Sequence, residues 1–463
     1  MKNKLPNMSD TICAICTPPG IGSIAVIRLS GVDSHKITKI VFQPHNQSES
    51  FIDRKATFGN ILRANKVIDE CLCIFFYSPG SLTGEDVVEI QTHGGPIVPN
   101  LVLKSLTDNG ARIAEPGEFT YRSFINGKID LLKAEAISSL IKSHSESAAK
   151  CSIDQLSGTL TKKLNKLRDL VIFLLAQFEA MVDFPEENIP EPTKKAILSD
   201  FNLSIQHSES ILNTYESGRL YMEGLQVLIM GQPNVGKSTL MNRMLDEDRS
   251  IVSNIPGTTR DILDADIFID GVRCNFFDTA GLRDSKDPIE NIGIKKAFSK
   301  IDASDLILLL LDKDSDYDYL NRIIKDVPRG KILHLINKSD LMKEDNKWGI
   351  IEQLEDKGLN YIEISAKKGK NLDLIRKKIL EIKNMDTKVD FEEGVLTTER
   401  QVEHLKKGLK NLKNGKQLFI EDKPIEIITI EIREYLNRIG EITGETTNEE
   451  VYDVLFSKFC IGK

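Results

Sequence analysis

The stretch Gly231-Gln-Pro-Asn-Val-Gly236-Lys237-Ser238 decides the fold of the central part of the chain. It follows an apolar strand expected over residues 225–230 and precedes the apolar residues Leu240 and Met241 of an expected helix. This strand, turn and helix context is typical of a phosphate-binding loop, in which backbone N–H groups and a helix N-terminus cradle phosphates. We expect Lys237 to reach the outer phosphates and the Ser238 hydroxyl to ligate Mg²⁺.

Apolar segments on either side of this loop predict a parallel sheet with helices on both faces, an α/β fold. Polar motifs follow these segments, and the carboxyl ends of parallel strands form the ligand-binding edge of such a sheet. The expected strands are residues 225–230, 273–277, 306–311, 332–336 and 361–364.

A carboxylate after the strand at 332–336 indicates which base is bound. Asp340 can accept paired hydrogen bonds from N1 and N2 of guanine, which adenine cannot donate, and a wrong base would leave the carboxylate unpaired. We therefore predict GTP rather than ATP. The expected base-contacting residues are Asn337, Lys338, Asp340, Ser365, Ala366 and Lys367.

Two further motifs complete the predicted nucleotide site. Asp278 and Gly281 end the strand at 273–277, which places Asp278 near the magnesium shell and the Gly281 N–H near the outer phosphate. Thr259 lies in the preceding switch loop and is the expected second magnesium ligand beside Ser238. The remaining expected contacts are Asn234, Val235, Gly236, Lys237, Thr239, Ser253, Asn254, Ile255, Pro256, Gly257, Thr258, Thr279 and Ala280.

The residue after Gly281 is Leu282, where Ras-like GTPases carry the glutamine that orients the attacking water. Leucine cannot orient water, so either hydrolysis is slow or a polar residue of the next loop takes this role. The spacing leaves four candidates open, namely Arg283, Asp284, Asp287 and Glu290.

The sequences on either side of the nucleotide domain show other residue patterns. The first 120 residues mix short apolar strands with Gly and Pro, typical of an α+β domain. Helical periodicity occupies residues 131–221 and resumes after Glu393, which predicts one helical domain split by an insertion. The predicted domains are residues 1–122, 123–222, 223–384 and 385–463, the second and fourth forming the helical domain.

Composition excludes several classes of protein. The 463 residues are 40% hydrophobic and 28% charged, the balance of a globular chain. The longest apolar stretches fall far short of the roughly 20 residues that span a bilayer, so we expect no membrane partner and a cytoplasmic location. Seven cysteines, an odd number, favour free thiols. The net charge of −8 means that a nucleic acid must meet local basic patches.

Several stretches outside the central domain carry a close resemblance to a known family. They are Thr17-Pro-Pro-Gly20, Ile27-Arg-Leu-Ser-Gly31, Thr83-Gly-Glu-Asp-Val-Val-Glu89, His93-Gly-Gly-Pro96, Glu115-Pro-Gly-Glu-Phe119, Ile442-Thr-Gly-Glu445 and Phe459-Cys-Ile-Gly-Lys463. Over essentially its whole length the chain resembles the MnmE (TrmE) family of tRNA modification GTPases. The resemblance implies an N-terminal folate-binding domain that also dimerises, a discontinuous helical domain and the inserted nucleotide domain.

The resemblance also implies a reaction and its partners. Family members form homodimers and act in a heterotetramer with the FAD-dependent MnmG (GidA) subunit. Together they add an aminomethyl or carboxymethylaminomethyl group to C5 of the wobble uridine of certain tRNAs. The one-carbon source is 5-formyltetrahydrofolate or a related folate, and GTP hydrolysis is required.

Site residues follow from the same resemblance. Glu290 becomes the leading candidate for positioning water, and potassium activates family members when two nucleotide domains face each other, replacing an arginine finger. The potassium ligands would be Asn234, Ser253, Ile255 and Thr258, with serine at 253 where the family often has threonine. The folate contacts would be Arg28, Glu89, Lys128 and Lys463, and Cys460 is a candidate for modification chemistry.

Basic residues on two expected helices are the best local patch for tRNA, and phosphate contacts there would make binding weaken with salt. They are Lys406, Lys407, Lys410, Lys413, Lys416, Lys162, Lys163, Lys166 and Arg168. The rival hypothesis is a GTP-switched RNA-binding factor of ribosome assembly, although no G-x-x-G loop of a KH domain is evident after Glu393. A third hypothesis is a folate-dependent one-carbon transferase that the nucleotide domain only regulates.

Overall fold

Two units, each with its own core, make up the computed structural model of this chain. One unit contains residues 1–138, 155–209 and 400–463, and the other contains residues 139–154 and 210–399. In the described part of the chain, no helix is both long and apolar enough to cross a membrane. The structure describes residues 9–46, 51–183, 194–248, 264–278, 301–313, 324, 327–342, 344–382, 394–446, 452, 455–456, 459 and 462.

The first unit begins with a seven-stranded sheet in the order β3-β4-β5-β6-β2-β1-β7. Its pairs are antiparallel except β1 with β7. Alternation along the strands buries Ile27 and Leu29 on the face that α1 (Ser34–Val41) and α2 (Val98–Asp108) cover. The strands are β1 (Ile12–Ile15), β2 (Ile24–Ser30), β3 (Phe42–Pro44), β4 (Ala56–Arg63), β5 (Lys66–Phe76), β6 (Val87–His93) and β7 (Arg112–Ile113).

Helix α3 (Glu118–Ile125) lies on the opposite side of this sheet, where its Phe119 packs with Ile12 and Ala14 of β1. The helix starts at Gly117, whose φ of +72° suits glycine. An ideal Cβ on Gly117 would also lie only 2.5 Å from the carbonyl oxygen of Phe456. The end of the chain therefore returns to the start of α3.

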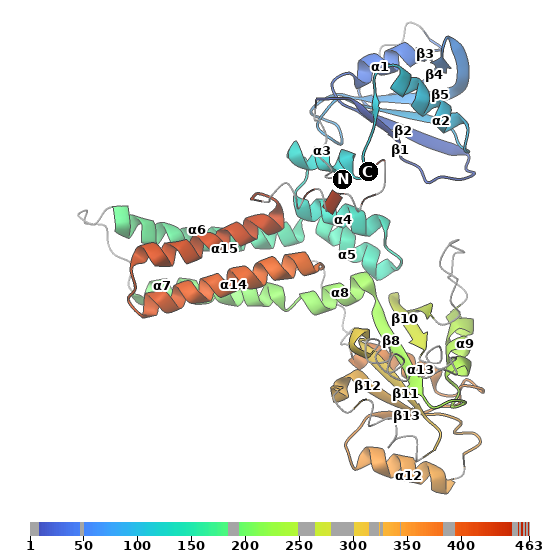
Figure 1. Ribbon diagram of the computed structural model, residues 1–463, viewed down its shortest axis with the longest axis vertical. Helices are drawn as coiled ribbons and strands as arrows, with labels where there is room; N and C mark the ends of the chain where they lie inside the picture. Colours follow the sequence, from blue (N-terminus) through green and yellow to red (C-terminus); the bar gives the residue numbers. More distant parts are fainter. Residues whose placement is uncertain are drawn as a thin grey trace, which may run out of the picture. The chain divides into compact units, whose positions relative to one another are not determined.

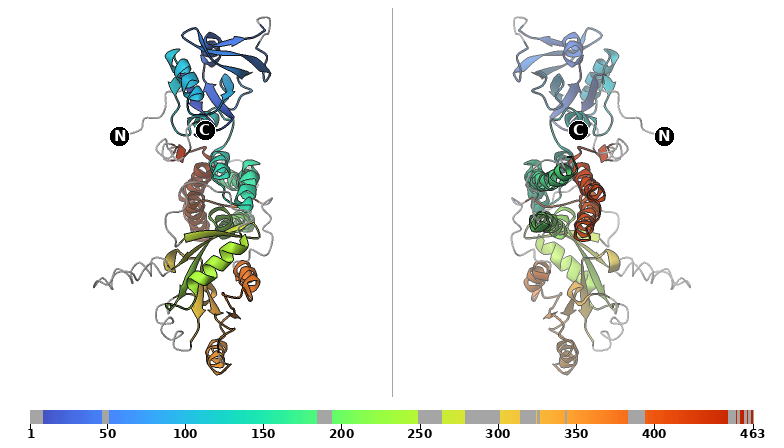
Figure 2. Two further views of the ribbon diagram at one scale, coloured as in Figure 1. Left: turned by 90° about the vertical axis from the view of Figure 1, so that its right-hand side faces the viewer. Right: turned by 90° about the vertical axis from the view of Figure 1, so that its left-hand side faces the viewer.

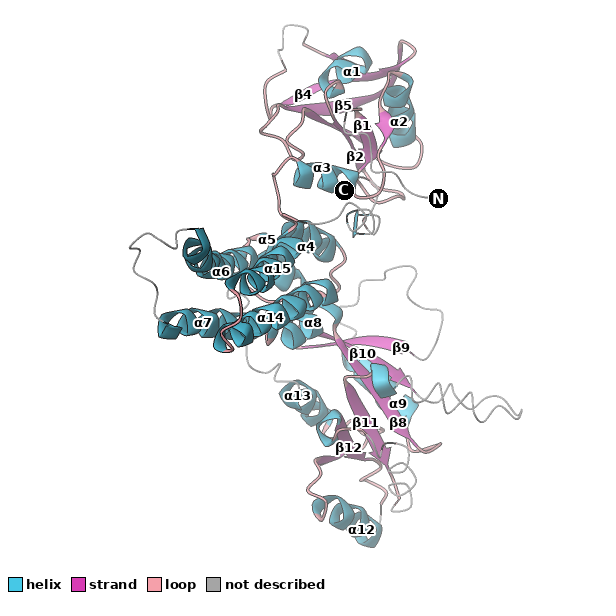
Figure 3. Cartoon of the chain, turned by 60° about the vertical axis from the view of Figure 1, so that its left-hand side comes forward, coloured by secondary structure: helices cyan, strands magenta, loops and turns pink. Residues whose placement is uncertain are grey.

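Four long helices from both sides of the inserted segment pack together, as Figures 1 and 3 show. The aromatic rings of Phe178, Phe201 and Phe419 join three of them, and Ser208 hydrogen bonds with Tyr435 of the fourth. The predicted split helical domain is thus confirmed. Its helices are α6 (Thr159–Asp183), α7 (Lys194–Leu212), α14 (Glu399–Ile420) and α15 (Ile425–Thr443). Helices α4 (Leu131–Ile141) and α5 (Glu146–Leu156) precede them in the chain, and most of α5 belongs to the second unit.

The second unit contains a six-stranded sheet in the order β13-β12-β11-β8-β10-β9. The five predicted strands are present and parallel, and β9 adds an antiparallel edge. Asp270 and Gly271 form the turn into β10, both with positive φ. The strands are β8 (Leu225–Gly231), β9 (Asp264–Ile269), β10 (Val272–Asp278), β11 (Leu306–Leu311), β12 (Ile332–Ile336) and β13 (Tyr361–Glu363).

Helices cover both faces of this sheet, as the pattern of the fully apolar strands predicts. On one face, Leu308 and Leu310 pack with α9 (Lys237–Asp248) and α13 (Leu372–Ile382), and Figure 2 shows the green helix α9 along the strands. On the other face, Leu309 packs with α12 (Glu344–Glu355). Helix α8 (Tyr215–Glu223) and Cys151 of α5 pack against the same face as α9 and α13.

Candidate functional site

The phosphate-binding loop has the predicted context. It leaves β8 at Gly231 and enters α9 at Lys237, and the N–H of Leu240 bonds to the carbonyl of Gly236. Gly236 has a φ of +103°, and an ideal Cβ there would lie 2.4 Å from Nδ2 of Asn337. Glycine is required at this position on both counts.

Lys237 is held inside this loop. Its Nζ donates to the carbonyl oxygens of Gly231 and Gln232, each at 3.1 Å, and the residue is 9% exposed. The side chains of Ser238 and Thr239 are exposed in the first turn of α9. The loop therefore places an ammonium group, a hydroxyl and the positive end of a helix together, which suits a phosphate with its magnesium ion.

Asn337 links this loop to the predicted guanine loop. Its Nδ2 donates to the carbonyl of Val235 at 2.7 Å, and its Oδ1 accepts from the N–H of Ala366 at 3.0 Å. The residue is only 2% exposed, so both bonds are shielded from water. Two motifs about 100 residues apart in the chain are thus joined by one amide.

Lys338 also contacts the phosphate-binding loop. Its Nζ donates to the carbonyl of Asn234 at 2.7 Å and pairs with the carboxylate of Asp312. Asp312 follows β11 directly and is 11% exposed, so it holds Lys338 from the neighbouring strand end. Asp312 is not among the residues predicted from the sequence, although its position immediately after an apolar strand is a usable signal.

Asp340 faces the loop that follows β13. Its Oδ1 accepts from the hydroxyl of Ser365 at 2.7 Å, and Nζ of Lys368 lies 3.5 Å from Oδ2. The hydrogen bond from Ser365 is the largest cause of a pKa below the usual value, with Lys368 adding to it. The carboxylate is therefore ionised at neutral pH, the state in which it could accept paired hydrogen-bond donors. Lys367 is exposed beside it.

The remaining predicted nucleotide contacts lie outside the described residues, apart from the backbone of Asp278, which pairs with Ile229 at the end of β10. The nucleotide contacts outside the described residues are Ser253, Asn254, Ile255, Pro256, Gly257, Thr258, Thr259, Thr279, Ala280 and Gly281. The candidates for positioning water, Arg283, Asp284, Asp287 and Glu290, also lie outside them, as do Cys460 and the predicted folate contact Lys463.

Among the predicted folate contacts, the structure brings Arg28 and Glu89 together on paired strands. Arg28 of β2 stands opposite Glu89 of β6, and its Nη2 lies 2.7 Å from Oε1 of the carboxylate. Both side chains remain partly exposed, at 15% and 22%. The guanidinium carbon lies 5.6 Å from the ring centroid of Phe119, a cation–π contact.

Lys128 belongs to the loop after α3. Its Nζ donates to the carbonyl of Pro79 at 2.8 Å, and its aliphatic chain lies beside Gly84. Gly462 lies beside the end of β1, where Sγ of Cys16, the residue after the strand, donates to its carbonyl at 3.2 Å. Lys128 thus lies against Pro79 and Gly84, and Gly462 lies beside the residue that follows β1.

The basic patch is partly neutralised within the helical bundle. Lys407 pairs with Glu403, Lys413 pairs with Glu209, and Lys416 donates to Asn202. Lys406 and Lys410 are exposed and have no such partner among the residues the structure describes. On α6, Lys162 and Lys166 are exposed, whereas Arg168 pairs with Glu445.

Comparison with known proteins matches the chain from end to end. A family model described as the MnmE helical domain matches residues 131–460, and one described as the GTP-binding protein TrmE N-terminus matches residues 11–128. The chain is 38% identical over 465 residues to the tRNA modification GTPase MnmE of Desulforamulus reducens, covering 98% of this chain and 100% of that protein.

The chain belongs to the MnmE family.

Other members are similarly related. The MnmE proteins of Finegoldia magna and Thermotoga maritima are 36% and 38% identical to this chain, covering 98% of it and 100% of each relative. The MnmE architecture is therefore present throughout, with a TrmE N-terminal domain, a discontinuous helical domain and an inserted nucleotide domain. This confirms the predicted fold class.

Proposed function

We propose that this MnmE-family chain is a potassium-dependent GTP hydrolase acting with an FAD-dependent MnmG (GidA) subunit. Together they would add a carboxymethylaminomethyl or aminomethyl group to C5 of the wobble uridine of certain tRNAs. Membership in the family supports the coarser statement directly, that the chain is a tRNA modification GTPase. The domain boundaries at residues 122, 222 and 384 remain part of the proposal.

The observation that carries GTP hydrolysis is the assembly around Asn337. One buried amide joins the phosphate-binding loop to the loop beside Asp340, so phosphate and base recognition are held in one rigid frame. Pre-positioned donors and charges of this kind are the main protein contribution to phosphoryl transfer. Mg²⁺ would be held by Ser238 and Thr259, and it would supply charge neutralisation at the phosphates.

Potassium activation and the water-positioning role of Glu290 are tested together. We expect hydrolysis to be faster in potassium than in sodium at equal ionic strength, because the ion would take the place of an arginine finger between two nucleotide domains. Glu290→Gln should slow hydrolysis in potassium with little change in GTP affinity, whereas Asp287→Asn in the same loop should not. Equal rates in the two salts would remove the potassium proposal, and an unaffected Glu290→Gln variant would return the role to Arg283, Asp284 or Asp287.

The folate part of the proposal rests on Arg28 and Glu89, whose opposite charges are paired and still partly open to solvent. A cation suits the glutamate tail of a folate, and a carboxylate suits the amino donors of its pterin ring. Lys128 is held against Pro79, and Lys463 is part of the proposal as the resemblance implies. Calorimetric titration with 5-formyltetrahydrofolate should detect binding that the double variant Arg28→Ala, Glu89→Ala loses.

Binding of tRNA is proposed on α14 and α6. Lys406, Lys410, Lys162 and Lys166 are exposed, and neutralising phosphates with them would make affinity fall as salt rises. A tRNA substrate also favours the predicted cytoplasmic location. The rival ribosome-assembly reading gains no support from any described feature, and matches over both the N-terminal and helical segments count against it.

A further inference from the structure

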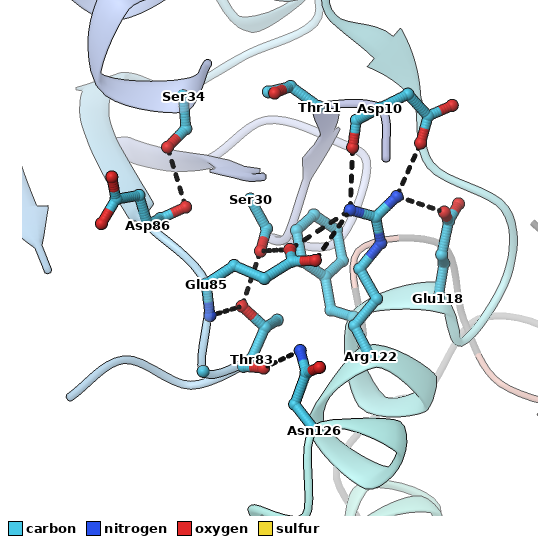
Figure 4. Close-up of polar contacts among 12 residues, drawn as sticks. Asp10, Thr11, Ser30, Ser34, Thr83, Glu85, Asp86, Glu118, Arg122 and Asn126 are labelled. Carbon is cyan, nitrogen blue, oxygen red and sulfur yellow. Dashed lines mark hydrogen bonds and ion pairs between the residues drawn. The ribbon is translucent and has the colours of Figure 1, made fainter. Parts of the chain in front are cut away.

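A cluster of charged side chains lies between the N-terminal sheet and α3. At its centre is Arg122, which is fully buried, and Figure 4 shows its guanidinium surrounded by acceptors. Nη2 lies 2.8 Å from Oδ1 of Asp10 and 3.0 Å from Oε1 of Glu118, and Nη1 lies 3.2 Å from Glu85. Arg112 also pairs with Asp10 and Glu118. We call these five residues the Arg122 cluster.

The cluster is an unusual way to hold a helix. It buries the guanidinium of Arg122 and the carboxylate of Glu118 completely, and burial of charge costs free energy that apolar residues would not. The side chains of Asp10, Glu85 and Arg112 are partly exposed. Burial alone would raise the pKa of Asp10, but hydrogen bonds and charges from Arg112 and Arg122 outweigh it and leave that pKa lowered. The carboxylate is therefore ionised. What such a network contributes is a defined geometry rather than net stability.

Hydrogen bonds extend the cluster to the strand that carries Arg28. Glu85 accepts from the hydroxyl of Ser30 at 2.6 Å, and Ser30 in turn lies 2.6 Å from the hydroxyl of Thr83. Ser30 and Thr83 are both completely buried, and Ser30 is two residues from Arg28 on β2, so both side chains are on the same face of the sheet.

The cluster also adjoins the residues that support Arg28 and Lys128, two of the proposed folate contacts. Glu118 precedes Phe119, the ring that supports the guanidinium of Arg28. At the other end of α3, Asn126 donates to the carbonyl of Thr83 at 2.7 Å, two residues before Lys128. Residues 79–84 contact the Lys128 side chain and belong to the loop that Glu85 anchors.

We propose that the Arg122 cluster, through its Glu85–Ser30 link, sets the distance between Arg28 and Lys128 and so determines folate affinity. Arg122, Glu85 and Ser30 are positioning residues, since none of them is assigned a contact with the ligand. The inference rests on the proposed folate site. It adds a second set of residues that acts on that site from between the sheet and α3.

The test measures the dissociation constant of 5-formyltetrahydrofolate for the full-length protein by calorimetry, with the melting temperature and the GTP hydrolysis rate alongside. Ser30→Ala removes the link and leaves every ion pair of Arg122 in place. Arg122→Lys keeps the charge but not the planar fork that reaches three acceptors. Ser105→Ala is the matched control, because Ser105 is equally buried in the same domain and donates to Leu62 at 2.7 Å from α2 on the other face.

We expect Ser30→Ala to weaken folate binding about five- to thirty-fold, the effect of one or two misplaced hydrogen-bonding groups. Arg122→Lys should weaken it further, and Ser105→Ala should melt at a temperature similar to that of Ser30→Ala yet bind folate normally. GTP hydrolysis should be unchanged in all three variants. In the modification reaction, Ser30→Ala should raise the folate concentration for half-maximal rate while the rate at saturating folate is retained.

Three outcomes would overturn the inference. Wild-type affinity in both Ser30→Ala and Arg122→Lys would show that the cluster does not act on the site. An equal loss in Ser105→Ala would reduce the effect to general destabilisation. If the wild-type protein itself binds no folate, the proposed folate site fails and this inference fails with it, which is a different result from normal binding in the variants.

Discussion

Replacing Asn337 with aspartate tests how the nucleotide site is held together. The substitution is nearly isosteric and keeps an oxygen acceptor for the N–H of Ala366, but it removes the Nδ2 donor to Val235. The lost bond contributes about 1 kcal/mol, and a buried acceptor left facing a carbonyl costs about 1–3 kcal/mol more, which is a lower bound because the new carboxylate also carries a charge. The sum of about 2–4 kcal/mol corresponds to an affinity loss of about 30- to 700-fold if all of it appears in nucleotide binding.

The assay is titration of a fluorescent guanine nucleotide, with thermal unfolding followed on the same samples. Asn371→Asp is the matched control, because Asn371 also donates its Nδ2 to a backbone carbonyl, that of Glu363 at 2.7 Å, within the same unit. Asn337→Asp should lose affinity, and Asn371→Asp should retain it. Wild-type nucleotide affinity in Asn337→Asp would refute the idea that this amide couples the two loops.

Three further predictions concern the packing around the sites. Burial lowers the pKa of His334 below its usual 6.5, so the free energy of unfolding of the nucleotide-binding unit should fall as pH drops below about 6.5. Urea unfolding at pH 7.5 and 5.5 should show this fall, and His334→Gln should lessen it; an unchanged pH dependence would contradict the assignment. Gly218→Ala should destabilise the same unit by about 1–3 kcal/mol in urea unfolding, because an ideal Cβ would lie 2.1 Å from the carbonyl oxygen of Leu396. A wild-type urea midpoint in this variant would show that the backbone shifts to accommodate the methyl group at no cost. Burial raises the pKa of the Cys13 thiol to about 12, so iodoacetamide at pH 8 should modify the half-buried Cys16 before Cys13. Peptide mass spectrometry would measure both labelling rates, and faster labelling of Cys13 would contradict its burial.

The nucleotide site was predictable because its chemistry is local. Each motif directly follows an apolar strand, and parallel strands bring their carboxyl ends to one edge of a sheet. Asn337, Asp340 and Lys237 therefore lie where the sequence placed them. Asp312 was missed because one aspartate after a strand has no motif around it. Strand β9 was missed as well, although Asp270-Gly271 is a recognisable hairpin turn.

The Arg122 cluster could not be predicted from the sequence. Its members extend from Asp10 to Arg122 and come from a strand entry, a loop, strand β7 and a helix, with no periodicity to connect them. On spacing alone, each is an ordinary surface charge. Only the folded N-terminal domain shows that Arg122 is buried, because the packing of α3 on β1 and β2 is a long-range contact that no local pattern encodes.

The central claim is that GTP hydrolysis by this chain drives wobble-uridine modification. The most direct test is nucleoside mass spectrometry of bulk tRNA from cells that lack the protein and carry either the wild-type chain or Lys237→Ala, expressed at equal levels. We expect the modified wobble uridine to return with the wild-type chain and to stay absent with Lys237→Ala. Full restoration by Lys237→Ala, or unchanged nucleosides in the deletion with accumulating ribosome precursors, would contradict it.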